Sequence, residues 1–272
     1  MPFVIDIDPI AFRLGGLAIH WYGIIVALAV LIGLWYAARE ARRAGIDAEA
    51  FESGAWWVGI AGVLGARALY VLQRGLDPGM GPLGFFMIWD GGLSFYGGLV
   101  AAGLALAVFA RRRRLSLARL ADVAAPPAAL GMAIGHLGRV VSGDSLGVPT
   151  TLPWAVVYRN PDAMAPLGEP LQPTQLYEAI AVGVLFVALR VGRTRLEHQG
   201  AGAVAGAYLI GLSAIHFVLF FLRDEPTIFL GLKTAQWIGL GLGAVGLVTL
   251  AVLVARRPVA NASLPTPEVG RP

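Results

Sequence analysis

Cysteine is absent from this chain of 272 residues, and histidine occurs only four times, at positions 20, 136, 198 and 216. Without cysteine there can be no disulfides, no thiolate metal sites and no cysteine nucleophile. No HExxH pattern occurs either, so we expect no catalytic metal.

Charged residues are also scarce. They make up 14% of the chain, whereas 57% of the residues are hydrophobic and the mean hydropathy is +0.70. Soluble domains are about a quarter charged, so this composition predicts an integral membrane protein. A sequence pI near 9.8 could indicate a nucleic-acid partner. However, the basic residues mark the ends of apolar runs, and we expect no nucleic acid.

Long apolar runs divide the chain. A membrane span needs about 20 mostly apolar residues, and seven stretches qualify: 18–38, 53–73, 92–110, 121–142, 174–191, 202–222 and 236–255. The first run lacks a basic preceding region and a small-residue cleavage site, so we interpret it as a retained span. The sequence therefore predicts an all-α, polytopic membrane protein with seven transmembrane helices.

Arginines follow every second span, which sets the predicted orientation. They lie after spans one, three, five and seven: Arg39, Arg42, Arg43; Arg111 to Arg114 and Arg119; Arg190, Arg193, Arg195; Arg256 and Arg257. Basic residues concentrate on the cytoplasmic side of membrane proteins. The pattern predicts an N-terminus outside and a C-terminus in the cytoplasm.

The seven spans and their connections make up a predicted membrane domain, residues 18–257. The parts of the chain outside this domain are small. Residues 1–17 are expected to form an amphipathic segment at the outer interface, with Phe3, Ile5, Ile10, Phe12 and Leu14 as its apolar set. Residues 143–173 form the longest outer loop. Residues 258–272 are polar and proline-rich, which predicts a disordered cytoplasmic tail.

Polar residues gather at the predicted outer ends of the spans. The stretch Ile134–Trp154 places His136 and Arg139 at membrane depth, then breaks at Ser142-Gly143-Asp144. Ionisable groups are costly in hydrocarbon, so such a cluster favours a functional site. Cations at the mouth of a cavity would suit an anionic lipid headgroup.

Each of these residues also has a structural interpretation. Arg139 could reach the headgroups from an interfacial position, and the two histidines could bond between helices. Tyr22 could anchor the interface, and the glycine pairs 91–92 and 97–98 could serve close packing. Arg67 lies deep in span two, where a buried arginine needs a partner, and we expect it to pair with Glu178 or Asp144.

Six motifs along the chain resemble those of the prolipoprotein diacylglyceryl transferases, and they occur in the family's order. They are IHWYG, GARALYVL, WDGGLSFYGGL, IGHLGRVVSGDSLG, QPTQLYEA and HFVLFFLRDEP with LKTAQWIGL. The resemblance covers residues 18–255. It implies a seven-span enzyme of the bacterial cytoplasmic (inner) membrane. Such an enzyme would move the diacylglyceryl group of phosphatidylglycerol onto the lipobox cysteine of a preprolipoprotein signal peptide, releasing glycerol phosphate.

The chain departs from the family pattern at several positions. An ungapped match places His136 at an expected arginine, Arg139 at an asparagine, and Ser142 and Asp144 at an asparagine and a glutamate. Tyr96 stands where the family often has histidine. In span six, His216 replaces an arginine and Phe220 a glutamate, while Arg223 is kept.

The resemblance implies a set of site residues. Arg139 and Arg223 would bind the phosphate, and His136 and His216 would be second cations or would activate the thiol, with Tyr96 beside them. Substrate contacts would come from eight further residues: Tyr22, Gly97, Gly98, Ser142, Asp144, Gly147, Gln175 and Tyr177. No metal or cofactor is implied.

Two other interpretations remain open. The replaced positions also fit a family member that has lost this transfer, or changed its lipid, and binds anionic phospholipid or lipoprotein only. A small-molecule transporter is disfavoured because no internal repeat is evident.

Overall fold

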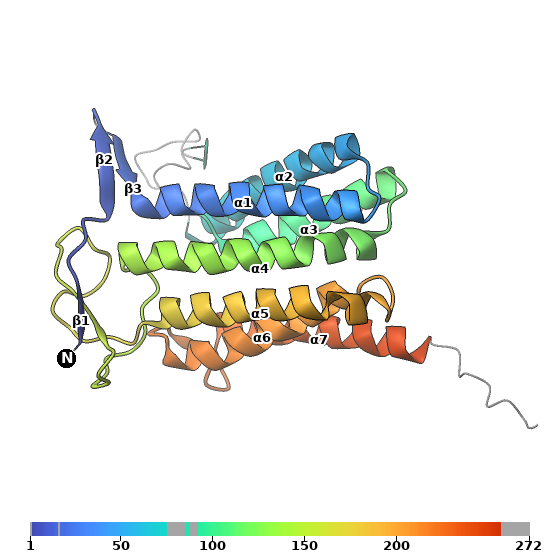
Figure 1. Ribbon diagram of the computed structural model, residues 1–272. Helices are drawn as coiled ribbons and strands as arrows, with labels where there is room; N and C mark the ends of the chain where they lie inside the picture. The colour runs from blue at the N-terminus through green and yellow to red at the C-terminus, as the bar shows by residue number, and fades with distance from the viewer. Residues whose placement is uncertain (1, 16, 75–84, 87–91, 257–272) are drawn as a thin grey trace, which may run out of the picture.

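A computed structural model describes residues 2–15, 17–74, 85–86 and 92–256. The predicted tail, 258–272, lies outside them. Each of the seven predicted stretches holds a helix: α1 (Trp21–Arg43), α2 (Ala48–Arg74), α3 (Phe95–Arg112), α4 (Leu117–Ser142), α5 (Thr174–Glu197), α6 (Ala203–Leu219, continued by the 3-10 turn η3, Phe220–Leu222) and α7 (Thr234–Ala255). The protein is mostly helical, and its long helices lie side by side (Figure 1).

Within the described part of the chain, six helices are long and apolar enough to cross a membrane: α1, α2, α4, α5, α6 with η3, and α7. Helix α3 has 18 residues and ends in two arginines. Large apolar side chains such as Leu31, Trp35 and Trp56 are exposed on the outside of the bundle. This arrangement is typical of a lipid-facing surface and supports a polytopic membrane protein.

Small residues line the contacts between neighbouring helices. In α7 the buried positions include Gly239, Gly243 and Gly246. Gly65 of α2 faces Gly97 of α3 so closely that a Cβ on Gly97 would lie 2.3 Å from the Gly65 carbonyl oxygen. Without side chains between them, the two backbones pack directly, and dispersion contacts hold the pair together.

Short strands gather at one end of the bundle. β1 (Phe3–Ile5) pairs in parallel with β4 (Val156–Tyr158), and β2 (Ile10–Leu14) forms a hairpin with β3 (Leu17–His20). A third pair, β5 (Thr227–Phe229) with β6 (Leu232–Lys233), precedes α7. The N-terminal strands and the chain between α4 and α5 lie together at the left of Figure 1. The segment that we expected at the interface is therefore strand, paired in part with the long loop.

The β1–β4 pair fastens this end to α4. Tyr158, 1% exposed, donates a hydrogen bond from its hydroxyl to the carbonyl oxygen of Val140, over 2.6 Å. Burial raises the pKa of Tyr158 to about 12, so its hydroxyl stays protonated and remains a donor. The loop is thereby held beside the last turn of α4, where Arg139 lies.

Candidate active site

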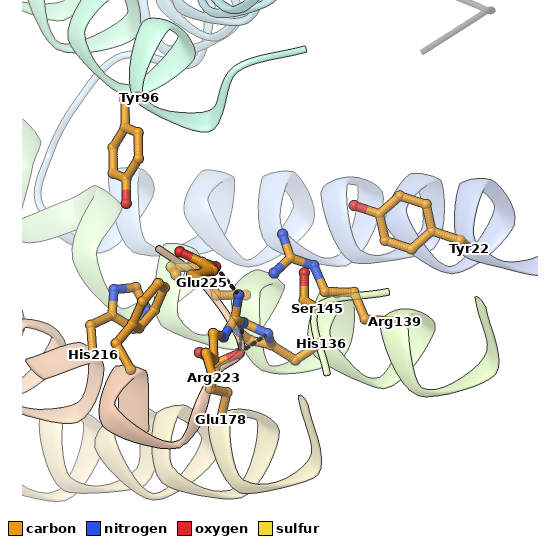
Figure 2. A pocket seen from close by; sticks show the side chains of 12 residues that line it. Tyr22, Tyr96, His136, Arg139, Ser145, Glu178, His216, Arg223 and Glu225 are labelled. Atoms are coloured by element: carbon orange, nitrogen blue, oxygen red, sulfur yellow. Dashed lines mark hydrogen bonds and ion pairs between the residues drawn. The ribbon is translucent and has the colours of Figure 1, made fainter. Parts of the chain in front are cut away.

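A cavity of about 280 Å³ lies between the helices at the end that carries the strands. Side chains from α1, α3, α4, α5 and α6 meet there with the loops that follow α4 and α6 (Figure 2). Its lining is Tyr22, Tyr96, Met132, Gly135, His136, Arg139, Ser145, Glu178, His216, Phe220, Arg223 and Glu225. Six of these residues were predicted site residues: Tyr22, Tyr96, His136, Arg139, His216 and Arg223.

Helix α4 supplies two of them from its last turns. His136 and Arg139 are three residues apart, which places both on one face of the helix. The helix ends at Gly143, whose φ of 71° is the left-handed conformation that glycine adopts without strain. The chain then turns sharply and brings Ser145 back to the cavity wall.

Glu178 is the buried centre of the cluster. Its side chain is 0% exposed, and its Oε2 lies 2.5 Å from Arg223 NH2 and 3.0 Å from His136 Nδ1. His136 Nδ1 is within reach of this carboxylate oxygen, but the contact is not a well-aligned hydrogen bond. A buried carboxylate requires such partners, because an isolated charge would be costly to remove from water.

Arg223 is held on several sides. Its NH1 lies 3.3 Å from Oε1 of Glu225, and its guanidinium carbon is 4.5 Å from the centroid of the Phe220 ring. Lys233 donates hydrogen bonds from Nζ to the backbone oxygens of Phe220 and Arg223. These contacts fix both the side chain and the backbone of Arg223.

Arg139 is the more accessible arginine. Its side chain is 27% exposed, against 5% for Arg223, and its Nε lies 3.8 Å from Oδ2 of Asp144. That separation is too long for a hydrogen bond. Arg139 can therefore turn toward an incoming anion at a smaller cost than Arg223, which would have to leave Glu178.

Two tyrosines and the second histidine complete the walls. In Figure 2 the hydroxyl of Tyr22 of α1 is directed toward Arg139, and that of Tyr96 of α3 is directed toward the side of the cluster where His216 and Glu225 lie. His216 of α6 packs against Phe220, with ring centroids 5.6 Å apart. The cavity thus combines cations, carboxylates, phenols and imidazoles with apolar surface, as an amphipathic substrate requires.

Five predicted substrate-binding residues fix the loop beside the cavity. Their contacts are Gln175 Nε2 to Asp144 O (2.7 Å), Gly147 N to Gln172 O (3.1 Å), Ser142 Oγ to Arg139 O (3.2 Å), and Tyr177 Oη to Gln172 Oε1 (3.1 Å). A Cβ on Gly147 would lie 2.5 Å from that of Gln172. These residues hold the wall in place, and Asp144 adds its carboxylate near Arg139.

Gly97 and Gly98 lie in the contact between α2 and α3 and do not line the cavity. Their surroundings fit the structural interpretation of this glycine pair, which is close packing between helices. The absence of a Cβ there allows the first turn of α3 to approach α2, which places the adjacent Tyr96 over the cluster.

The expected partner of Arg67 was wrong. Glu178 pairs with His136 and Arg223, and Asp144 lies by Arg139. Arg67 instead donates hydrogen bonds to the carbonyl oxygens of Phe85 and Gly92, each over 3.0 Å. It therefore supports the chain leading into α3.

Six of the lining residues were not predicted site residues, and three of these six are polar: Glu178, Ser145 and Glu225. Glu178 carried a usable signal, since a carboxylate at the start of an apolar span is a functional candidate by default. Ser145 and Glu225 carried no such signal, because each lies in a polar loop, where a polar residue is ordinary. In the part of the chain that the structure describes, no group of three His, Asp or Glu side chains is placed to hold a metal ion.

Comparison with known proteins gives the family. A family model described as prolipoprotein diacylglyceryl transferase matches residues 9–252. Phosphatidylglycerol--prolipoprotein diacylglyceryl transferases of Bordetella avium (strain 197N) and Geobacter sulfurreducens (strain ATCC 51573 / DSM 12127 / PCA) are 36% and 35% identical to it. The matches cover 92% and 93% of this chain and 96% and 97% of those relatives. They confirm the resemblance predicted from the six motifs, and the chain belongs to the prolipoprotein diacylglyceryl transferase family.

Proposed function

We propose that this protein transfers the diacylglyceryl group of phosphatidylglycerol to the thiol of a lipobox cysteine in a preprolipoprotein during lipoprotein maturation. The observation that carries the proposal is the cavity, in which Arg139 and Arg223 face one space together with His136 and His216. Family membership supplies the reaction.

The reaction needs a place for negative charge. The cysteine sulfur attacks the glycerol carbon, a carbon–sulfur bond forms, and the carbon–oxygen bond to the phosphate breaks. Glycerol phosphate leaves with the electron pair. Arg139 would bind the phosphate first, and Arg223 would strengthen its contact as charge builds on the leaving oxygen.

The thiol must lose its proton, because the thiolate is the nucleophile. His136 is the better-placed acceptor. If Nδ1 carries a proton toward Glu178, Nε2 is left free to accept one. Tyr96 and Tyr22 would orient the substrates, since a neutral phenol is a poor base. His216 would act as a second acceptor or as a cation when protonated.

The setting follows from the same proposal. Seven helices would cross the cytoplasmic (inner) membrane, α3 among them, with the N-terminus and the strand-bearing end outside. Arginines near the ends of α1, α3, α5 and α7 support this orientation. Residues 1–17 would rest on the outer interface, residues 18–257 would form the membrane domain, and the outward-facing cavity would meet the translocated lipobox.

A transfer assay tests the proposal. Full-length protein in liposomes with phosphatidylglycerol would receive a lipobox peptide, and mass spectrometry would detect thioether-linked diacylglycerol on its cysteine. Product should form with phosphatidylglycerol, be absent with phosphatidylethanolamine, and be lost in Arg139→Ala.

The competing function is lipid binding by a family member that has lost the transfer activity. It is favoured by the pairing of Arg223 with Glu178 and Glu225, because these carboxylates already neutralise its charge. The same assay separates the two. Phosphatidylglycerol that is bound but never transferred would overturn the proposal and establish a lipid-binding protein.

A further inference from the structure

Two adjoining cavities lie at the other end of the bundle. One, of about 290 Å³, lies between α1, α4 and α5 and is walled by Trp35, Tyr36, Leu130 and Phe186. The other, of about 740 Å³, is more polar and opens beside it. The C-terminal ends of α1 and α5 and the N-terminal end of α4 meet there, at the right of Figure 1. The proposed transfer involves neither cavity.

Arginines form the boundary between the two cavities. Arg43 and Arg190 line both of them, and Arg39 lines the apolar one. Arg43 is paired with the buried carboxylate of Glu40, over 2.9 Å. Arg39 and Arg190 are exposed, and neither has an ion pair with any residue that the structure describes. Two positive charges without an ion-pair partner among the described residues therefore lie at the mouth of the apolar cavity.

Tyr36 supplies an independent observation. Its side chain packs edge-on against Phe186, with centroids 5.8 Å apart, and the residue is 8% exposed. Within the described residues, its hydroxyl has no hydrogen-bond partner. A buried hydroxyl without a hydrogen-bond partner is unfavourable, because it has lost its hydrogen bonds to water. Since Tyr36 lines the apolar cavity, an occupant with a polar atom at that depth would remove this penalty.

We propose that these cavities bind an anionic glycerophospholipid as a second lipid site, separate from the catalytic one. The phosphate lies between Arg39 and Arg190, the Tyr36 hydroxyl donates to an ester oxygen, and one acyl chain packs against Leu130 and Phe186. A free phosphate would make no contact with the apolar walls, and a neutral lipid would not neutralise the two arginines. Both chemistries meet in an anionic lipid.

The site lies far from the catalytic cavity. Tyr36 and Tyr22 are on the same helix and 14 positions apart, which corresponds to about 21 Å at about 1.5 Å of rise per residue. One lipid cannot place its headgroup in both. The new site would lie in the opposite leaflet, and it would join α1 to α4 and α5, the helices that carry Tyr22, His136 and Glu178 at their other ends.

Lipid counting by native mass spectrometry tests this inference. Full-length protein, delipidated in a nonionic detergent, would receive phosphatidylglycerol or phosphatidylethanolamine with the same acyl chains. We expect Arg39→Gln with Arg190→Gln to reduce retained phosphatidylglycerol about tenfold at this site. Arg112→Gln with Arg114→Gln is the matched control, because it removes two exposed arginines that line neither cavity.

Arg139→Ala separates the two lipid sites. It should remove lipid from the catalytic cavity and leave the second lipid in place. If the transfer proposal fails while the Arg39 and Arg190 variant still loses lipid, the inference stands alone. Equal lipid retention in that variant and its control would overturn the inference, as would equal retention of the two headgroups.

Tyr36→Phe gives a second readout that unfolding of a variant cannot imitate. Removing a buried hydroxyl without a partner should leave the lipid-free protein at least as stable as the parent protein. The rise in melting temperature on adding phosphatidylglycerol should be smaller than in the parent. An unchanged rise would exclude the hydroxyl contact, and an equal rise with glycerol phosphate alone would exclude a lipid as the occupant.

Discussion

Glu178 of α5 and Arg223, which follows η3, lie 45 positions apart in the chain and form a buried ion pair, with Arg223 NH2 2.5 Å from Glu178 Oε2. The pair joins α5 to the chain that follows α6, and it joins a carboxylate to the arginine proposed to stabilise the leaving phosphate. Removing one member of a buried pair leaves the other charge without compensation.

Glu178→Ala should therefore lower the free energy of unfolding by about 3 kcal/mol and reduce transfer severely. Glu225→Gln is the comparison, because Glu225 contacts the same guanidinium but its side chain is 41% exposed. An exposed pair contributes about 1 kcal/mol or less, so this variant should stay near the parent in thermal unfolding. Equal stability of the two variants would contradict the central role of Glu178.

Arg139 and His136 should differ in their effect on transfer. Arg139→Ala removes the accessible cation, and we expect kcat/KM to fall by about 100-fold to 1,000-fold. His136→Ala should leave measurable activity, because both arginines remain and His216 lines the same cavity. Similar, mild losses in both variants would show that Arg139 does not bind the phosphate.

The helices could be predicted from the sequence because apolar runs of membrane length leave few alternatives. The polar cluster could be predicted because charges such as Arg139 are conspicuous in those runs. The partners in the ion pairs were harder to predict from the sequence. Arg67 was expected to pair with Glu178 or Asp144 because a buried arginine needs a partner, but pairing depends on how each helix is rotated about its axis. Helices that are apolar all round show no amphipathic stripe from which to read that rotation.

The strands and the loop contacts were not predicted for a different reason. β1 pairs with β4, about 150 residues further along the chain, and no local pattern indicates such a partner. Gln175 was identified as a polar residue opening a span, yet its amide donates to the backbone of Asp144. A motif shows that a residue matters, and geometry decides whether it contacts substrate or holds the residue that does.

The glycine pair in α3 gives a matched test of close packing. A Cβ on Gly97 would lie 2.3 Å from the Gly65 carbonyl oxygen, whereas one on Gly98 would lie 3.2 Å from that of Gly62. Gly97→Ala should destabilise the protein by about 1–3 kcal/mol because backbone must move, and Gly98→Ala should cost less. Thermal unfolding measures both. A larger loss in Gly98→Ala would contradict the packing of α2 on α3.

Asp122 of α4 should stabilise the start of α6. Its Oδ2 accepts a hydrogen bond from Gly202 N over 2.7 Å, and its Oδ1 accepts one from Ala205 N over 2.8 Å. The carboxylate thus caps a helix whose own N-cap residue, Gly202, has no side chain. Asp122→Ala should cost about 1–2 kcal/mol in unfolding, and Asp122→Asn, which keeps one acceptor, should cost less. Equal losses would show that the second bond contributes nothing.

The pH dependence of transfer should identify the group that activates the thiol. A free cysteine has a pKa of about 8.5, so its thiolate fraction grows from a few per cent near pH 7 to a majority near pH 9. If His136 accepts the thiol proton, the defect of His136→Ala should shrink over this range, because the substrate increasingly arrives as thiolate. Tyr96→Phe should show a modest defect that is the same at both pH values, since an orienting hydroxyl is needed for thiol and thiolate alike. The opposite result would be a defect that shrinks with rising pH in Tyr96→Phe and stays constant in His136→Ala. It would show that Tyr96 activates the thiol and that His136 orients the substrate.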